Sequence, residues 1–258
     1  MTYRAPRRAA AGAAVVACLL FLSGCGGSLK EAAVGGVASY ESGKASFDRG
    51  DYMDAIADLK AYVEQFPGTE NTDDALFYLG ESYFRTKDFA LASGQYDRLI
   101  RDFPQSPLQP DAMFQLAKCD DLQSRSAPLD QTETTRAISR YQSFLQLYPE
   151  HAKAAEANTR IVALNDRLAE KRFRNGRLYI RLKQYDAAAH YLRALIADFP
   201  SSPWAGEAGL LLADVLVHQG KPGEAASALR AVGESKATPD TKKRAEERLR
   251  EIEGRVKS

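Results

Sequence analysis

The sequence predicts an all-α fold, a superhelical solenoid of about five helix-turn-helix repeats, from two observations. An aromatic residue followed by proline recurs four times, and the prolines are Pro67, Pro104, Pro149 and Pro200. Proline cannot continue a helix, and after a short polar stretch an acidic residue suits the dipole of the next first turn. Small and large apolar residues also recur at fixed offsets before each proline. Units repeated in this way stack side by side, so we expect the helices to form in pairs.

The first two units show the pattern in full. Its positions in the first unit are Gly43, Tyr52, Ala55, Leu59, Tyr62 and Pro67. In the second unit they are Leu76, Leu79, Gly80, Tyr83, Phe89, Ala92, Tyr96, Leu99 and Pro104. The small residues let the two helices of a unit approach, and the large ones fill the space between them. This pattern resembles the tetratricopeptide repeat (TPR), whose period is about 34 residues.

The later units are longer than the first two, because the four prolines lie 37, 45 and 51 residues apart. We place the extra residues of the third unit in a polar loop at 123–134. Those of the fourth unit fit an extended helix over 152–168, where Ile161, Leu164 and Leu168 share one face. We expect this helix to bridge two halves of the solenoid.

A fifth unit and a terminal helix complete the predicted solenoid. The fifth unit covers 204–232 and turns at 219–222, where glycine ends one helix and proline begins the next. Residues 241–256 place Ala245, Leu249 and Ile252 at three- and four-residue spacing. This charged helix either caps the last apolar face or docks on a partner, and capping is the simpler interpretation.

Residues 1–24 resemble a bacterial lipoprotein signal peptide. Three arginines precede an apolar stretch over 9–21, which is short for a permanent membrane span. The stretch closes on Leu22-Ser23-Gly24-Cys25, which is typical of a lipobox, so Cys25 is the predicted lipidation site. The alternative is an ordinary secretory signal with an incidental cysteine.

A lipidated cysteine would hold the chain to a membrane without spanning it. Each buried methylene of an acyl chain contributes about 0.8 kcal/mol, so several chains anchor firmly. Gly26, not aspartate, follows Cys25. In the lipoprotein sorting signals that this segment resembles, the absence of aspartate after the cysteine implies export to the outer membrane.

Charge and cysteine content exclude other classes. The formal net charge is +1 at pH 7, and it falls to −2 when the three arginines of residues 1–24 are removed, because that segment has no acid. Neither value fits a nucleic-acid binder, which needs a pronounced basic face. Once Cys18 leaves with the signal and Cys25 carries lipid, Cys119 is the last cysteine. No intrachain disulfide can form, and we expect Cys119 to be a buried apolar residue.

The residues predict a non-enzyme that needs no metal or cofactor. His151, His190 and His218 lack a second ligand at the spacing of a metal site. The pairs Asp73-Asp74 and Asp120-Asp121 stand near helix ends, where we interpret them as solvated capping acids. No serine has a local histidine and acid, although a triad assembled through space stays open.

The first helix of each repeat is predicted to line a concave groove. The repeat register directs nine rings and charges into it: Tyr40, Lys44, Phe47, Phe77, Glu81, Phe84, Arg85, Phe114 and Lys118. Such a groove suits an extended or helical peptide, with apolar side chains on the rings and a carboxylate on a cation. Each ring could instead fill the core, and for any single residue the two interpretations weigh evenly.

The bridging segment carries a family resemblance. Residues 164–169, Tyr179 and the turn at 183–187 resemble the BamD (YfiO-type) family of outer-membrane β-barrel assembly lipoproteins, and the likeness runs from the lipobox to about Val232. The resemblance implies five repeats and a lipid-anchored protein on the outer membrane, facing the periplasm. It implies that the N-terminal repeats bind unfolded outer-membrane protein precursors, which end in an aromatic residue and a free carboxylate. It also implies that the C-terminal repeats dock on the periplasmic domains of BamA, among other assembly subunits.

By position, we nominate four residues for the BamA contact: Arg177, Arg181, Lys183 and Tyr191. The chain divides into a signal (1–24), a lipidated tether (25–38), an N-terminal half (39–123), a C-terminal half with the bridging helix (124–235) and a charged helix (236–258). The nearer alternative is another periplasmic TPR adaptor lipoprotein, a cell-division coordinator or a pilotin, which would not need the bridge. The farther alternative, an enzyme, would require a clustered acid with a perturbed pKa.

Overall fold

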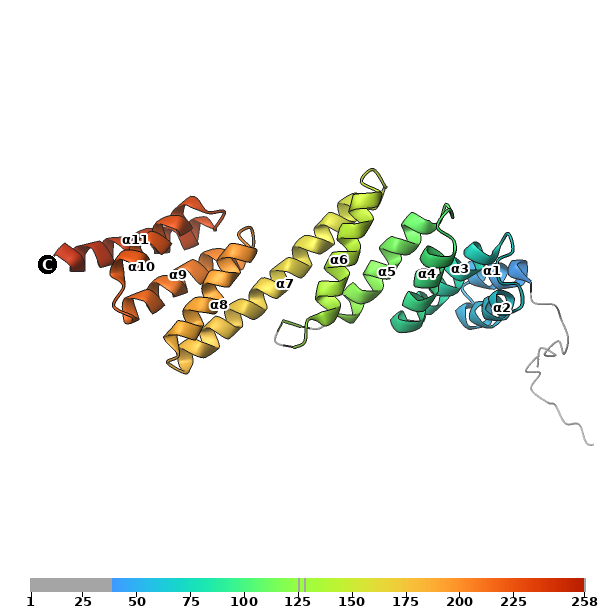
Figure 1. The fold of residues 1–258 in the computed structure, drawn as a ribbon, viewed down its shortest axis with the longest axis horizontal. Helices are drawn as coiled ribbons and strands as arrows, with labels where there is room; N and C mark the ends of the chain where they lie inside the picture. Colours follow the sequence, from blue (N-terminus) through green and yellow to red (C-terminus); the bar gives the residue numbers. More distant parts are fainter. Residues whose placement is uncertain (1–38, 125, 128, 258) are drawn as a thin grey trace, which may run out of the picture. The chain divides into compact units, whose positions relative to one another are not determined.

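The computed structural model describes residues 39–124, 126–127 and 129–257, which form eleven α-helices and no strand (Figure 1). The helices are α1 (Tyr40–Arg49), α2 (Tyr52–Gln65), α3 (Thr72–Arg85), α4 (Phe89–Asp102), α5 (Gln109–Gln123), α6 (Thr132–Leu147), α7 (Ala154–Arg181), α8 (Tyr185–Asp198), α9 (Pro203–His218), α10 (Pro222–Glu234) and α11 (Pro239–Lys257). The predicted all-α TPR solenoid is confirmed. Among these helices, none is both long and apolar enough to cross a membrane. The predicted signal, Cys25 and the tether lie outside the described residues.

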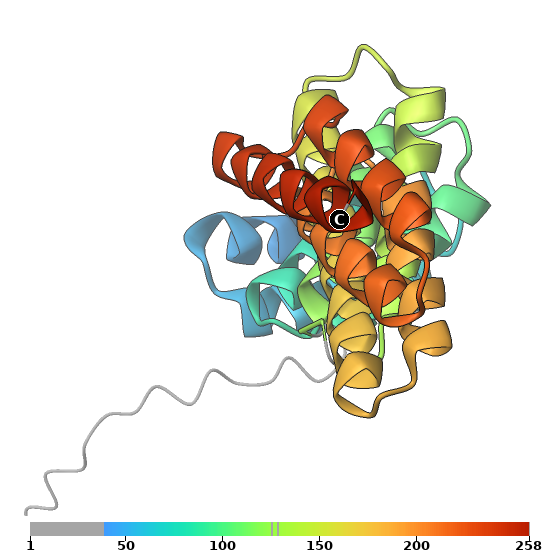
Figure 2. The ribbon, with the colours of Figure 1, turned by 90° about the vertical axis from the view of Figure 1, so that its left-hand side faces the viewer.

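Each helix packs against the next along the chain (Figure 1). The first helices of successive repeats also meet, because α1 packs on α3, α7 on α9 and α9 on α11. The odd-numbered helices are the first helices of their repeats, which we call inner helices, and the even-numbered helices are the second ones, which we call outer helices. Figure 2 views the molecule from the α11 end, where α11 lies over the last repeat.

The aromatic-proline motif ends four outer helices with the same hydrogen bond. The residue after each of α2, α4, α6 and α8 is aromatic, and its N–H donates to the carbonyl four residues earlier. The proline that follows has no N–H with which to continue the ladder. The chain then turns and enters the inner helix of the next repeat.

Three apolar clusters run along the described residues. The N-terminal cluster, from α2 to α5, is rich in rings, with Tyr62 and Tyr96 buried among leucines. The middle cluster joins α5, α6 and α7 around Phe114 and Tyr141. The C-terminal cluster, from α7 to α11, consists of leucine, alanine and valine apart from Phe173.

Close helix contact within a repeat depends on glycine. A Cβ added at Gly80 would lie 2.7 Å from the Tyr96 ring, so α3 and α4 could not approach as they do. A Cβ at Gly209 would likewise collide with Val232, which brings α9 against α10. The repeat pattern placed a small residue at Gly80 for this reason.

The bridging helix is longer than the sequence predicts. The extended helix expected at 152–168 and the fourth inner helix form one continuous helix, α7, of 28 residues. No proline or glycine interrupts it before Gly176, whose missing side chain leaves room for Leu192. Through Leu164 and Phe173, α7 takes part in both the middle and the C-terminal clusters.

The terminal helix α11 covers the last repeat. Its Ala245 is buried in the C-terminal cluster, and Ile252 packs against that cluster. Arg244 Nη1 pairs with Glu207 of α9 at 2.8 Å. This contact and the apolar face hold α11 against α9 and α10.

Candidate functional site

A first cluster of rings and charges joins α1 and α3. The Lys44 ammonium lies 4.6 Å from the centroid of the Tyr78 ring and 2.6 Å from the Asp48 carboxylate. The Phe47 ring packs on Tyr78, with centroids 5.1 Å apart. Burial raises the pKa of Tyr40, so its hydroxyl stays neutral. Tyr40, Lys44 and Phe47 are all partly exposed, as a ligand-binding surface requires.

A second cluster joins α3 and α5. The Lys118 ammonium lies 5.7 Å from the centroid of Phe84 and 5.9 Å from that of Phe114. Its ion pair with Glu156 is long, at 3.8 Å. A cation held this weakly can bind the carboxylate of a ligand at little cost.

The structure places Phe114 in the core and not in the groove. Its ring is 1% exposed and packs on Tyr141 and Phe144, with centroids 5.6 Å away in each case. The middle cluster needs a large ring at this point because α5, α6 and α7 converge on it. The expectation of an accessible ring at Phe114 is therefore corrected.

Glu81 is also buried, at 6% exposure, contrary to its expected place in the groove. Its carboxylate accepts hydrogen bonds from the Tyr96 hydroxyl, at 2.7 Å, and from the Gln115 amide. Arg85 lies 3.8 Å away and is more than half exposed. Glu81 thus joins α3, α4 and α5, because a buried carboxylate needs hydrogen-bond partners.

The other seven predicted groove residues are at least partly exposed. Phe77 lies between Tyr78 and Tyr96, with ring centroids at 5.7 and 6.0 Å. Sequence reasoning missed Tyr78, which joins both Phe47 and Lys44. Its place in the first cluster arises from contact with another helix, and no local spacing reveals that.

The pair Asp120-Asp121 does not form the solvated cap that the sequence suggested. Asp120 is 1% exposed and pairs with Arg136 at 2.9 Å and Arg140 at 2.8 Å, both on α6. Asp121 is also buried and lies 3.6 Å from Arg160 on α7. Burial raises the pKa of Asp121, against the opposing effect of that arginine. The two acids hold α5, α6 and α7 together.

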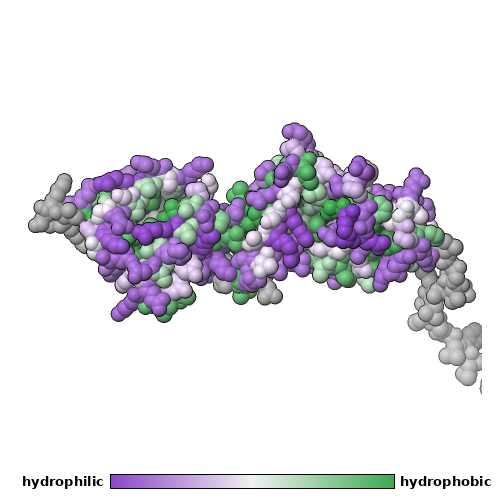
Figure 3. Space-filling model, in the orientation of Figure 1, coloured by the Kyte–Doolittle hydropathy of each residue, from purple (hydrophilic) through white to green (hydrophobic). Residues whose placement is uncertain are grey.

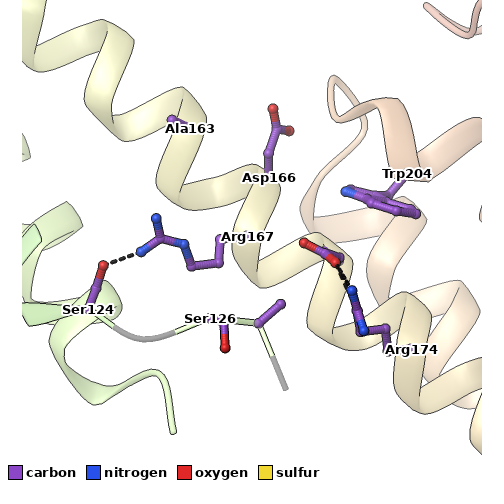
Figure 4. A pocket seen from close by; sticks show the side chains of 9 residues that line it. Ser124, Ser126, Ala163, Asp166, Arg167, Arg174 and Trp204 are labelled. Atoms are coloured by element: carbon purple, nitrogen blue, oxygen red, sulfur yellow. Dashed lines mark hydrogen bonds and ion pairs between the residues drawn. The ribbon is translucent and has the colours of Figure 1, made fainter. Parts of the chain in front are cut away.

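A crevice of about 540 Å³ lies between α7, the loop after α5 and the start of α9 (Figure 4). Arg167 of α7 points toward Ser124 and donates a hydrogen bond to its hydroxyl, and Arg174 turns toward Glu170. Trp204 of α9 faces the same space. On the face drawn in Figure 3, hydrophilic residues cover most of the surface, with hydrophobic patches between them.

The four residues nominated for a partner do not form one cluster. Tyr191 of α8 stacks on Tyr179 with centroids 5.2 Å apart. Lys183 is exposed in the α7–α8 turn at a φ of 57°. Arg177 and Arg181 are exposed on the side of α7 opposite Tyr179. Each lies two residues from Tyr179, and two residues along a helix turn the side chain by about 200°. No contact in the described structure joins Lys183 or Tyr191 to the two arginines.

No group of three potential metal ligands occurs in the part of the chain that the structure describes. His218 stacks on Tyr185, with centroids 5.0 Å apart, and the Phe144 ring contacts His151 edge to face. Cys119 is buried in the N-terminal cluster, and burial raises the pKa of its thiol to about 12. The thiolate that metal ions and oxidants need is therefore scarce there.

A family model described as an outer membrane lipoprotein, YfiO, matches residues 36–226. The chain is similar to the outer membrane protein assembly factor BamD of Caulobacter vibrioides, at 29% identity over 61% of this chain and 52% of that protein. It thus spans about half the length of that relative. BamD of Haemophilus influenzae is 26% identical over 73% of this chain and 76% of its own. A solved TPR protein of Thermus thermophilus is 16% identical over 80% of this chain and 95% of that one, with a TM-score of 0.35.

Proposed function

This chain belongs to the YfiO family of outer membrane lipoproteins, and from that membership we propose that it is a scaffold of the machinery that assembles β-barrels in the outer membrane. Its relatives in Caulobacter and Haemophilus carry the name of outer membrane protein assembly factor. The N-terminal repeats bind unfolded outer-membrane protein precursors, and the C-terminal repeats dock on the periplasmic domains of BamA. The scaffold works by binding alone, and no bond is made or broken.

The adjacent rings and cations of the N-terminal half are the observation that supports precursor binding. A segment that ends in an aromatic residue and a carboxylate needs a ring and a cation a few ångströms apart. Phe84 and Lys118 offer this arrangement, with the ammonium 5.7 Å from the ring centroid. Lys44 is the weaker candidate, because the Asp48 carboxylate already holds it at 2.6 Å. Lys118 is therefore the residue that anchors the terminal carboxylate.

Attachment to the outer membrane depends on Cys25, which carries the lipid in this proposal. Replacing Cys25 with alanine should move the protein from the membrane fraction to the soluble periplasm, because the acyl chains are lost. Fractionation and metabolic labelling with a fatty acid measure this. Continued acyl labelling of the Cys25→Ala chain would contradict the anchor.

Purification from detergent-solubilised membranes tests the assembly role. A tagged full-length chain should co-purify BamA and unfolded barrel precursors, and both should remain bound after washing. A chain with Lys118→Glu should keep BamA and lose precursors, since only the N-terminal groove is altered. Recovery of cell-division or secretin proteins in place of BamA would favour another periplasmic TPR adaptor.

A further inference from the structure

The C-terminal half contains a cavity to which the proposed function assigns no residue. It measures about 460 Å³ and lies between α7, α9 and α11. Its apolar wall is formed by Ile180 of α7, Leu211 and Val217 of α9, and Ile252 of α11. Val217 is 40% exposed, so part of this wall meets solvent. An apolar surface of this kind is filled at little cost by the side chains of a bound segment.

Two exposed arginines of α7 lie within about one helical turn of Ile180, the residue that α7 contributes to the cavity, and neither has a carboxylate partner among the described residues. Arg177 and Arg181 flank Ile180 at three- and one-residue spacing, on the side of α7 away from α8. Both are exposed, and neither forms an ion pair with any residue that the structure describes. The neighbouring arginines differ, because each pairs with a carboxylate within the half: Arg172 with Asp198, Arg174 with Glu170, Arg193 with Glu224 and Arg248 with Asp214.

The terminal helix α11 is the third wall of the cavity as well as a cover for the last repeat. Arg248 donates to the Asp214 carboxylate at 2.6 Å and to the Leu210 carbonyl at 3.3 Å, which fixes the wall against α9. Glu251 lines the same space and has no ion-pair partner among the described side chains. Three charged residues line the cavity itself: Asp214 and Arg248, which pair with each other, and Glu251. Arg177 and Arg181 lie outside this lining, on the same stretch of α7 as Ile180.

We infer that this space, the C-terminal groove, binds an acidic amphipathic segment of a docking partner. The apolar side chains of the segment enter between Ile180, Val217 and Ile252, and its carboxylates pair with Arg177 and Arg181. The carboxylates lie along only one side of the segment, so that they do not face the Glu251 carboxylate and are not repelled by it. This arrangement sets the direction in which the segment binds. The inference rests on the proposed docking of a partner on the C-terminal repeats, and it supplies the chemistry of that contact.

Short fluorescein-labelled peptides with one shared leucine pattern test the groove by anisotropy on the full chain. One peptide carries glutamates along one side, a second carries lysines there, and a third carries glutamines. The glutamate peptide should bind best, and its affinity should fall as salt is raised. In the chain with Arg177→Glu and Arg181→Glu, its affinity should fall at least about tenfold, the loss of roughly 1.4 kcal/mol of charge pairing.

Two further variants separate a groove from general electrostatics. Lys60→Glu with Lys87→Glu makes the same change in net charge on exposed residues of the N-terminal half, and it should leave binding unchanged. Val217→Asn changes no charge and should weaken binding, because it places a polar group in the apolar wall. Equal losses in the two double variants, no effect of Val217→Asn, or preference for the lysine peptide would each overturn the groove.

Co-purification distinguishes this inference from the function on which it rests. The Arg177→Glu, Arg181→Glu chain should lose BamA from solubilised membranes and retain unfolded precursors. If the unaltered chain recovers no BamA, the proposed function fails, and the peptide series still decides the groove. If the altered chain retains BamA at the unaltered level, the link between groove and partner is overturned.

Discussion

The N-terminal and C-terminal halves share one pairing of helices and differ in the side chains that fill it. Buried rings such as Tyr96 dominate the N-terminal cluster, and lysines lie over partly exposed rings on its inner helices. Leucine, alanine and valine dominate the C-terminal cluster. There α7, α9 and α11 line a cavity with a partly apolar wall, and Arg177 and Arg181 of α7 form no ion pair with the described residues. A few positions on the inner helices therefore give the two halves different side-chain chemistry, while the repeat framework stays the same.

Replacing a core leucine in each half should have the largest effect. Leu76→Ala and Leu192→Ala each remove a fully buried side chain and should cost about 2–5 kcal/mol of unfolding free energy. Because a solenoid is stabilised by neighbouring contacts, each loss should stay mainly in its own half. Hydrogen exchange should show reduced protection in α2–α4 for the first change and in α8–α10 for the second.

Cys119 supplies a second measurement of the same comparison, because it belongs to the N-terminal cluster. In a chain that begins after Cys25, its thiol should react slowly with iodoacetamide while the half is folded. Leu76→Ala should speed the reaction, and Leu192→Ala should not. Equal acceleration by both changes would mean that the two halves open as one unit.

Removing two rings of the N-terminal half should have the next largest effect. Phe77→Ala with Phe84→Ala should weaken a peptide that ends in an aromatic residue and a free carboxylate by roughly tenfold or more. The matched control is Tyr179→Ala with Tyr191→Ala, which removes two partly exposed rings from the C-terminal half. Anisotropy measures the affinity, and circular dichroism checks that the helices remain. Equal losses in both variants would reject the N-terminal groove.

Asp121 of α5, which lies near Arg160 of α7, should have a smaller effect on stability that depends on pH. Burial raises the pKa of Asp121 in the folded chain, so the folded state binds its proton more tightly than the unfolded state. This contribution to stability is present below the ordinary pKa of about 3.9 and is lost as pH rises through the raised value. From neutral to acidic pH, the melting temperature should therefore rise in the native chain relative to Asp121→Asn. A difference that does not change with pH would contradict this assignment.

An exposed ion pair should have the smallest effect. Arg193 and Glu224 join α8 to α10, and both side chains are more than half exposed. Arg193→Ala should change the unfolding free energy by about 0.5 kcal/mol or less, because solvent screens the pair. Arg140→Ala should cost more, since its partner Asp120 is buried. Denaturant unfolding measures the unfolding free energy of both variants. Equal costs would contradict the distinction between the buried ion pair of α5 and α6 and the exposed pair of α8 and α10.

Local signals were enough to predict the repeats. Pro67 and its counterparts end helices because the proline ring leaves no backbone N–H to continue the hydrogen-bond ladder. Gly80 is required because a Cβ there would collide with the Tyr96 ring. The polar loop predicted at 123–134 contains the connection between α5, which ends at Gln123, and α6, which begins at Thr132. The length of α7 was underestimated, because no residue in the sequence marks the point where a bridge becomes an inner helix.

The candidate site was less predictable, because burial depends on neighbours that are distant in sequence. Phe114 and Phe84 both belong to the predicted groove set, yet only Phe114 meets the converging helices of the middle cluster. Asp120 resembles a capping acid until Arg136 and Arg140 approach from α6. The role of α11 as a cavity wall likewise depends on α7, which lies far away along the chain.

The continuity of α7 has a mechanical consequence. Its first turns carry Glu156, which reaches Lys118 in the N-terminal half, and its last turns carry Arg177 and Arg181. At 1.5 Å per residue, its 28 residues make a rod of roughly 42 Å. Because no proline kinks this rod, its two ends are held at a fixed separation along one axis. The helix thus acts as a spacer of constant length between the two halves of the solenoid.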